Sequence, residues 1–211
     1  MNNKNNIFNE RRPLIGILRG ITPLEAESIS DVLIEAGITI IEVPLNSPQP
    51  YKTIERMVKF HGKSAIFGAG TVLHVNEVQT VSDCGGQIIV SPNLNTLVVK
   101  KTKDLNMFSF PGVFTPTECF DALQSGADGL KFFPASLLKE ENFMAINSVL
   151  PTNTISIAVG GIDEKKFSSW LNVNISGFGL GSNLYKPGML VEEVKSRAQE
   201  IVKAYDNHFN P

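Results

Sequence analysis

One lysine of this chain lies inside an apolar run, Leu130-Lys131-Phe132-Phe133-Pro134. An ammonium group in such surroundings must be paired or lose its charge, because burial and nearby cations lower the pKa of a lysine. The neutral amine can then attack a ketone and form a Schiff base. The alternative is a lysine that follows an apolar wall to the surface or sits in a structural ion pair. We favour the catalytic interpretation because Lys131 would stand near the end of a strand.

A carboxylate has a similar setting in Ile40-Ile41-Glu42-Val43-Pro44. Burial would raise the pKa of Glu42 toward the range that is useful for moving protons. Paired with Lys131, it would supply the acid and base beside a nucleophile. The alternative is a buried carboxylate that only neutralises Lys131 or Arg19.

Two glycine-rich turns follow the last two predicted strands. They are Gly160-Gly161, with Asp163 at a predicted helix start, and Gly181-Ser182. Backbone amides and a hydroxyl at such turns can hold a phosphate, as the last two loops of many barrels do. A glycine pair alone indicates turn geometry more often than a ligand. Two of them after consecutive strands predict a phosphate site.

The elements that must position these residues alternate along the whole chain. Short apolar runs are followed by turns and then by helix-period segments, the pattern of β/α units. Helices start with capping signals at Thr22 to Glu25 and Thr115 to Glu118, and end at Gly37 and Gly126. The predicted strands are Leu14–Leu18, Thr39–Val43, Ala65–Gly68, Gln87–Val90, Met107–Phe110, Gly129–Phe132, Ile155–Ala158 and Gly177–Leu180.

Alternating units of this kind form either an open doubly wound sheet or a closed barrel. The first strand is not followed by a Gly-x-Gly-x-x-Gly turn, and the count of about eight units favours closure. The chain of 211 residues is short beside the roughly 250 typical of such barrels. We predict a single-domain (β/α)₈ TIM barrel over residues 11–211, preceded by a frayed tail over residues 1–10.

The composition excludes several partners. Nineteen Lys and Arg against 21 Asp and Glu give a net charge of −2, which lacks the basic excess of a nucleic-acid-binding protein. No secretory signal and no apolar stretch of the roughly 20 residues that cross a bilayer occur, so we expect a cytoplasmic protein without membrane contact. The two cysteines lie in no Cys-x-x-Cys or His-rich context, and the histidines lie in helix or tail segments where none ends a predicted strand, which favours a mechanism without a metal. The residues concerned are Cys84, Cys119, His61, His74 and His208.

The series of motifs resembles the class I 2-keto-3-deoxy-6-phosphogluconate/6-phosphogalactonate aldolases over nearly the whole chain after residue 10. The shared segments, in the family's order, are Ile41-Glu42-Val43, Gly68-Ala69-Gly70-Thr71, Ser91-Pro92, Phe110-Pro111-Gly112, Leu130-Lys131-Phe132-Phe133-Pro134, Gly160-Gly161 and Gly181-Ser182.

This resemblance implies roles for single residues. Lys131 would be the Schiff-base lysine, Glu42 the proton-transferring carboxylate, Thr71 a contact to the substrate carboxylate and Phe133 a wall of the pocket. It also implies a homotrimer that needs no metal or other cofactor. The further substrate-binding positions, including those for the phosphate, are Pro92, Gly160, Gly161, Gly181 and Ser182.

Three positions resemble the galactonate branch of the family. The gluconate branch has an arginine four residues after the glutamate, where this chain has Asn46, and this chain carries Arg19 instead. Val159 replaces the threonine that is typical of the gluconate enzymes. The implied reaction is the reversible cleavage of 2-dehydro-3-deoxy-6-phospho-D-galactonate to pyruvate and D-glyceraldehyde 3-phosphate. Arg19 would bind the pyruvate carboxylate with two hydrogen bonds.

Three other functions stay open at this point. The substrate could be the gluconate epimer, or both epimers, because their discrimination can rest on about 1–3 kcal/mol. A metal-free isomerase or synthase of phosphorylated substrates would use the phosphate site without covalent chemistry on Lys131. A phosphosugar sensor would bind without turnover.

Overall fold

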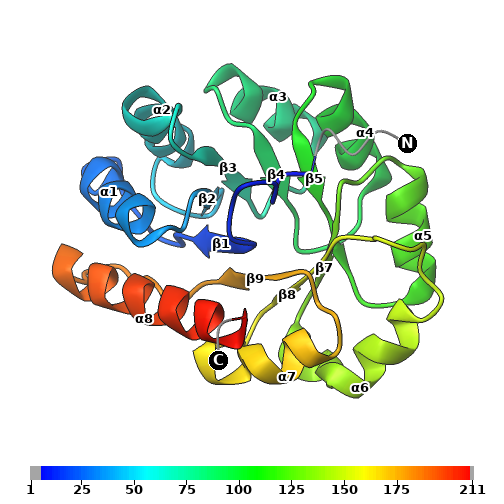
Figure 1. Cartoon of the computed structure of the whole chain (residues 1–211). Coiled ribbons are helices and arrows are strands. Elements are labelled where there is room, and N and C mark those ends of the chain that lie inside the picture. The colour runs from blue at the N-terminus through cyan, green and yellow to red at the C-terminus, as the bar shows by residue number, and fades with distance from the viewer. Residues whose placement is uncertain (1–5, 210–211) are drawn as a thin grey trace.

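The computed structural model describes residues 6–209, which form a closed barrel of parallel strands surrounded by helices (Figure 1). The strands run in the order β5-β4-β3-β2-β1-β9-β8-β7-β6, and every hydrogen-bonded pair is parallel. The strands are β1 Leu14–Ile17, β2 Ile40–Pro44, β3 Ile66–Gly70, β4 Ile88–Val90, β5 Phe108–Phe110, β6 Gly112–Val113, β7 Leu130–Phe132, β8 Ser156–Val159 and β9 Gly177–Leu180.

The nine strand segments are the eight predicted strands, because β5 and β6 are one strand interrupted at Pro111. Proline has no N–H for the ladder. The neighbouring strands stay attached across this break: Ser91 N–H donates to Phe110 O (3.2 Å) and Lys131 N–H donates to Pro111 O (2.9 Å). The sheet therefore closes through the fifth strand, which confirms the predicted (β/α)₈ barrel and excludes the open doubly wound sheet.

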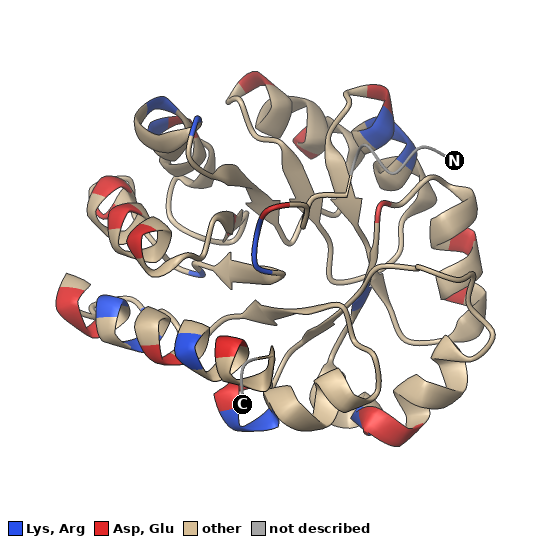
Figure 2. Ribbon diagram, in the orientation of Figure 1, with Lys and Arg blue, Asp and Glu red and all other residues tan. Residues whose placement is uncertain are grey.

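A helix follows each strand of the barrel and covers its outside (Figure 1). Charged residues lie mainly on these outer helices, and few lie near the centre of the barrel (Figure 2). Among the described residues, no helix is both long and apolar enough to span a membrane. The helices are α1 Ala26–Ala36, α2 Pro50–His61, α3 Val75–Asp83, α4 Thr96–Asp104, α5 Pro116–Gln124, α6 Ala135–Asn147, the 3₁₀ turn η1 Glu164–Lys166, α7 Phe167–Asn172 and α8 Val191–Phe209.

The capping signals are borne out in part. Thr115 caps α5 with the full reciprocal box to Glu118, as predicted. At the first helix, Glu25 accepts hydrogen bonds from the backbone and hydroxyl of Thr22, yet residues 23–25 form a turn and α1 begins only at Ala26. The glycines that end α1 and α5, Gly37 (φ 97°) and Gly126 (φ 96°), are left-handed, which glycine adopts without steric cost.

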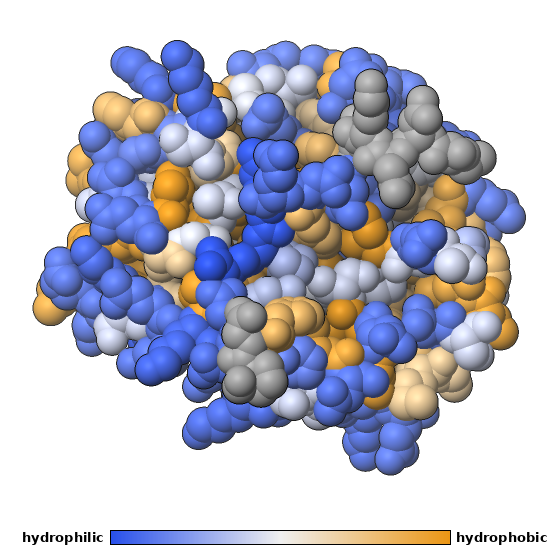
Figure 3. Space-filling model, in the orientation of Figure 1, coloured by the Kyte–Doolittle hydropathy of each residue, from blue (hydrophilic) through white to orange (hydrophobic). Residues whose placement is uncertain are grey.

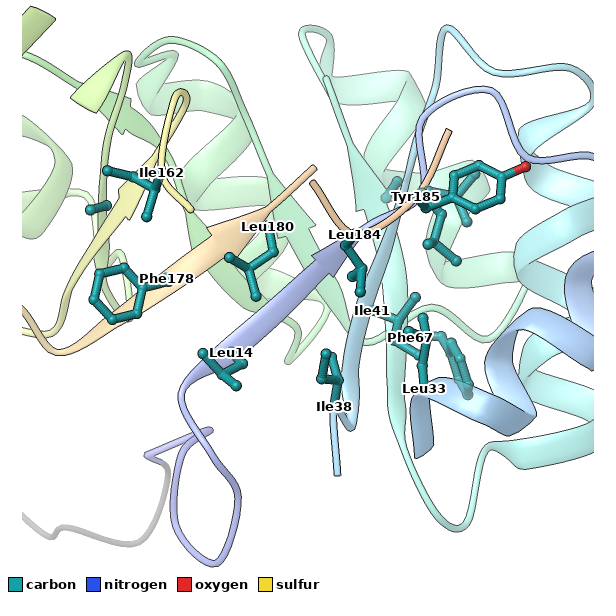
Figure 4. Close-up of a cluster of buried hydrophobic side chains, with 14 of the residues drawn as sticks. Leu14, Leu33, Ile38, Ile41, Phe67, Ile162, Phe178, Leu180, Leu184 and Tyr185 are labelled. Atoms are coloured by element: carbon teal, nitrogen blue, oxygen red, sulfur yellow. The ribbon is translucent and has the colours of Figure 1, made fainter. Parts of the chain in front are cut away.

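The side chains of the strands alternate between two cores. Leu14, Ile41 and Leu130 belong to the cluster between sheet and helices, part of which Figure 4 shows. Inward-facing isoleucines such as Ile15 and Ile40 form a second cluster inside the barrel. Because successive strand residues point to opposite faces, the same alternation turns Glu42 and Lys131 into the barrel.

The chain ahead of β1 corrects the predicted frayed tail. Residues 1–5 lie outside the described part of the structure, but Ile7 is only 2% exposed and packs in the cluster inside the barrel. The ring of Phe8 lies 6.0 Å from that of Phe110, and in Figure 1 this first segment crosses the barrel beside β4 and β5. Ile7 is therefore part of the core and Phe8 packs beside it, whereas Asn9 and Glu10 are exposed. Figure 3 shows the molecule from the same side as Figure 1, with hydrophilic side chains surrounding patches of hydrophobic ones.

Candidate active site

A cavity of about 490 Å³ opens where the barrel strands end, at their carboxyl-terminal side. Parallel barrels place their binding groups at this end because the loops that follow the strands converge there. All the predicted site residues line this one cavity, from loops far apart in the sequence. They are Arg19, Glu42, Thr71, Pro92, Lys131, Phe133, Val159, Gly160, Gly161, Gly181 and Ser182.

Lys131, at the centre of β7, is 5% exposed. Burial is the largest cause that lowers its pKa, Arg19 acts in the same direction, and the charge of Glu42 opposes both. Within the described residues its amine forms neither a hydrogen bond nor an ion pair, and it lies 4.8 Å from the centre of the Phe133 ring. The amine thus neither reaches the surface nor sits in a structural ion pair, the two alternatives to a reactive lysine.

Glu42, on β2, is 2% exposed, and its Oε2 has no hydrogen-bond partner among the described residues. Burial is the main cause that raises the pKa of this carboxyl group, against the lowering effect of Lys131 and Arg19. The charges of Lys131 and Glu42 influence each other, yet no ion pair within the described chain joins them. The carboxyl group is left free for a proton of a ligand.

The end of β3 is shaped around this carboxyl group. A Cβ atom on Gly70 would overlap the carboxyl group of Glu42, so only glycine leaves room for it. The next residue, Thr71, adopts φ 57°, which is rare for a β-branched side chain. Backbone strain of this kind often accompanies functional sites. Here it accompanies a side chain that lines the cavity beside Glu42.

The predicted phosphate loops lie at the same cavity. Gly160 (φ 93°) and Gly161 (φ 73°) are both left-handed, and Lys166 Nζ donates to Gly161 O at 2.6 Å. Two backbone amides, those of Leu184 and Tyr185, donate to Gly181 O. Gly160 and Gly161 thus serve the turn geometry, as the alternative interpretation held, and all three glycines border the cavity. The helix predicted from Asp163 is only the short turn η1 followed by α7.

Arg19 enters the cavity from the loop after β1, and its Nη1 donates to Asn46 Oδ1 in the loop after β2. The next two residues are also joined, because Gly20 N–H donates to Ser47 Oγ at 2.9 Å. Arg19 contributes to the pKa values of both Glu42 and Lys131, so the three charges act as one group.

Several cavity residues were missing from the sequence prediction. Ile17 and Gly179 face inward by the same alternation that places Glu42, so the strand pattern could have identified them. The segment after Ser182 also lines the cavity, and no sequence motif marks it. Asp163 lines the cavity as well, although it was predicted only as a helix start. The remaining residues of this group are Ile162, Asn183, Tyr185, Lys186 and Pro187.

The fold and this cavity define a barrel enzyme that holds a buried lysine and a buried glutamate at the carboxyl ends of its strands. The sequence model of one family, KDPG and KHG aldolase, matches residues 7–202. The chain belongs to this aldolase family and is a carbon–carbon lyase, which confirms the resemblance inferred from its motifs.

Individual relatives agree with the family. The chain is 48% identical over 195 residues to a probable 2-dehydro-3-deoxy-6-phosphogalactonate aldolase of Rhizobium meliloti, which covers 92% of each chain. It is 42% identical to the 2-dehydro-3-deoxy-6-phosphogalactonate aldolase of Escherichia coli, over 92% of this chain and 94% of that one. A solved structure described as native KDPGal superposes with a TM-score of 0.93 at 40% identity, over 94% of this chain and 97% of the other.

Proposed function

We propose that this enzyme cleaves 2-dehydro-3-deoxy-6-phospho-D-galactonate reversibly to pyruvate and D-glyceraldehyde 3-phosphate, through a Schiff base on Lys131. The observation that carries this proposal is the Lys131 amine, which is buried and has no hydrogen-bond or ion-pair partner among the described residues. A lysine held in this way has a lowered pKa and is a nucleophile near neutral pH.

The chemistry follows from that amine. Lys131 Nζ adds to the C2 ketone of the substrate, and loss of water leaves a protonated imine. The bond between C3 and C4 breaks, its electron pair moves into the enamine, and the C4 hydroxyl loses its proton as the aldehyde forms. The enamine then takes a proton at C3, and water hydrolyses the imine to pyruvate and the free amine.

Glu42 is the group that moves these protons. Its raised pKa, about 7, allows the carboxyl group both to accept and to donate a proton near neutral pH. Its unpartnered Oε2 leaves it free to do so. The proton taken from the C4 hydroxyl can therefore return at C3 or in the hydrolysis of the imine.

The two ends of the substrate bind to opposite groups of loops. Arg19 and Thr71 hold the carboxylate beside Lys131, and the turns at Gly160-Gly161 and Gly181-Ser182 hold the phosphate. Phe133 and Pro92 form walls between them. Binding both charged ends fixes the reacting carbons at the amine, so the energy of remote contacts lowers the barrier.

The galactonate epimer is supported by three differences from the gluconate branch and by the names of the two relatives. Asn46 stands where that branch has its arginine, and Arg19, in the loop after β1, supplies the positive charge instead. Val159 faces the cavity without a hydroxyl. Steady-state kcat/KM values with both epimers test this assignment. Equal values for the two sugars would make the enzyme an aldolase of both.

We also propose a homotrimer that works in the cytoplasm without a metal cofactor. Exposed apolar side chains in neighbouring units support self-association: Leu73 (38% exposed), Leu97 (62%) and Phe114 (38%). Asn95 Nδ2 donates to Leu73 O, which joins two of these loops. Light scattering of the wild type and of Leu97→Glu measures the assembly, and a wild-type monomer would contradict it.

Borohydride reduction in the presence of pyruvate tests the mechanism. We expect mass spectrometry to find one adduct, on the peptide that contains Lys131, and to find none in Lys131→Ala. Lys52→Ala, an exposed lysine on α2, is the matched control and should be trapped like the wild type. Turnover without trapping would support an isomerase or synthase that does not use Lys131 covalently, and trapping without turnover would support a sensor.

A further inference from the structure

Arg19 is a cavity cation that burial does not fix in place. Its side chain is exposed at the mouth, whereas Lys131 and Glu42 are enclosed by the barrel. An arginine side chain has many rotamers in solvent, and a carboxylate ligand requires one of them. The site therefore needs a contact outside the core that holds Arg19 in one rotamer.

Asn46 provides this contact with Arg19. Its Oδ1 accepts a hydrogen bond of 2.5 Å from Nη1 of Arg19, across the gap between the loops after β1 and β2. Asn46 does not line the cavity itself, so it is placed to act on a ligand only through Arg19. A guanidinium group donates only, and the amide oxygen is the acceptor that it requires.

The loop that carries Asn46 is itself fixed. Leu45 N–H donates to Gly70 O at 2.8 Å, and Ser47 N–H donates to Pro44 O at 2.9 Å. Ser47 Oγ in turn accepts from Gly20 N–H at 2.9 Å. Two successive residues of one loop thus hold two successive residues of the other, and the backbone beneath Arg19 cannot shift independently of β2.

The nitrogen of Arg19 that donates to Asn46 determines which of its N–H groups remain for a ligand. Nη1 gives one of its two N–H groups to Asn46, and the edge formed by Nε and Nη2 keeps both of its N–H groups for a ligand. The same edge binds a carboxylate elsewhere in this chain: Arg12 donates from Nε and Nη2 to the two oxygens of Asp206, each at 2.8 Å. This parallel pair of hydrogen bonds is the strongest geometry between arginine and a carboxylate.

We propose that Asn46 is a positioning residue, which holds Arg19 by Nη1 so that its Nε and Nη2 edge binds the carboxylate of the keto acid. The inference rests on the proposed function, since the ligand is the pyruvate end of its substrate. This gives position 46 a role in this chain, which has no arginine there. The side chain of Asn46 orients Arg19, the arginine in the loop after β1.

The position of Arg19 also affects the nucleophile. The charges that act on Lys131 are Arg19, which lowers the pKa of the amine, and Glu42, which raises it. Asp163, Tyr185 and Lys186 are the other ionisable side chains that line this cavity among the described residues. An Arg19 that leaves its place takes a positive charge away from Lys131, so the pKa of the amine should rise.

The test uses pyruvate as the probe and the full-length enzyme. In Asn46→Ala we expect the KM for pyruvate, measured by exchange of its methyl protons with deuterium, to rise about fivefold, as the loss of one hydrogen bond implies. Borohydride trapping should require a higher pH than in the wild type. Asn93→Ala is the control: this exposed asparagine is on the loop after β4, does not line the cavity and forms no side-chain hydrogen bond with described residues.

A double-mutant cycle separates positioning from other effects. If Asn46 acts through Arg19, then Asn46→Ala should change KM by less than twofold in an Arg19→Ala background. The same fold-change in both backgrounds, or a wild-type KM in Asn46→Ala alone, would overturn the proposal. Failure of the proposed function gives a different result, because the wild type itself would not be trapped by pyruvate.

Discussion

Replacement of Lys131 by methionine should produce an enzyme that is inactive and more stable than the wild type at pH 7. Burial is the main reason why the pKa of Lys131 falls from 10.5 to about 8. Between these values the unfolded chain binds a proton that the folded chain does not, so this residue makes stability rise with pH. Below about pH 8 the folded state bears the whole cost of the buried charge, about 3 kcal/mol by linkage.

Two effects reduce the gain. Methionine has a similar length and fills the space of the lysine stem, but its fit costs up to about 1.5 kcal/mol. Glu42 loses the positive charge that lowers its pKa, and it responds by binding a proton near pH 7. The net stabilisation should be about 1–3 kcal/mol, which raises the Tm of a chain of this size by roughly 2–4 °C for each kcal/mol.

Urea unfolding at pH 7 and at pH 10 measures this effect, at one protein concentration for all variants because assembly would shift the midpoint. The advantage of methionine should shrink toward pH 10, where the wild-type lysine is neutral in the folded state and begins to lose its charge in the unfolded one. Lys131→Ala serves as the control, since it removes the charge but also opens a cavity, which lowers stability.

The reasoning is refuted if the methionine variant unfolds at lower urea than the wild type at pH 7, with an unchanged slope. That result would mean that the lysine stabilises the fold through a partner, and a paired lysine is not a free nucleophile.

Further predictions concern other parts of the barrel. Glu42→Gln should still be trapped by pyruvate, whereas exchange of the pyruvate methyl protons should slow by about 10²–10⁴-fold, as the loss of a general acid and base implies; normal exchange would remove Glu42 from the mechanism. Gly70→Ala should lose about 1–3 kcal/mol in urea unfolding together with most activity, because its methyl group takes the place of the Glu42 carboxyl group. Ile7→Ala should lose about 2–5 kcal/mol with an unchanged kcat, since Ile7 packs in the inner cluster and lines no part of the cavity; a loss below about 0.5 kcal/mol would mean that this segment is frayed, as predicted from the sequence. Dialysis against EDTA should leave kcat/KM unchanged, and a loss that zinc or magnesium restores would contradict a metal-free mechanism.

The strand pattern explains why so much of the site could be predicted. The buried strands of a barrel are apolar runs, so a charge inside one is conspicuous, and Lys131 and Glu42 are such charges. Seven of the eight predicted strands lie within two residues of their observed bounds, and the fifth ends three residues short because the observed strand continues through β6 to Val113. The interruption of the fifth strand at Pro111 was not predicted. It depends on hydrogen bonds from the neighbouring strands to β5 on one side of Pro111 and to β6 on the other, and the sequence does not show these bonds.

Other features depend on contacts between distant segments. Ile7 follows a run rich in asparagine and has no periodic pattern around it, so its burial inside the barrel leaves no local signal. The contact of Arg19 with Asn46 joins loops 27 residues apart. Part of the cavity wall is formed by the loop after Ser182, which includes Lys186. Such placements follow from how the loops pack, which residue types alone do not specify.

The packed isoleucines inside the barrel impose an order on catalysis. Below Lys131 the interior is filled by side chains such as Ile15, Ile40 and Ile7, so molecules enter and leave only through the opposite end. In the proposed mechanism the C2 carbon of the three-carbon acid stays bound to Lys131, deep in the cavity, while the phosphorylated aldehyde departs through the mouth. In the synthetic direction of the proposed reaction the keto acid must reach Lys131 before the aldehyde binds, because the aldehyde would otherwise block its path.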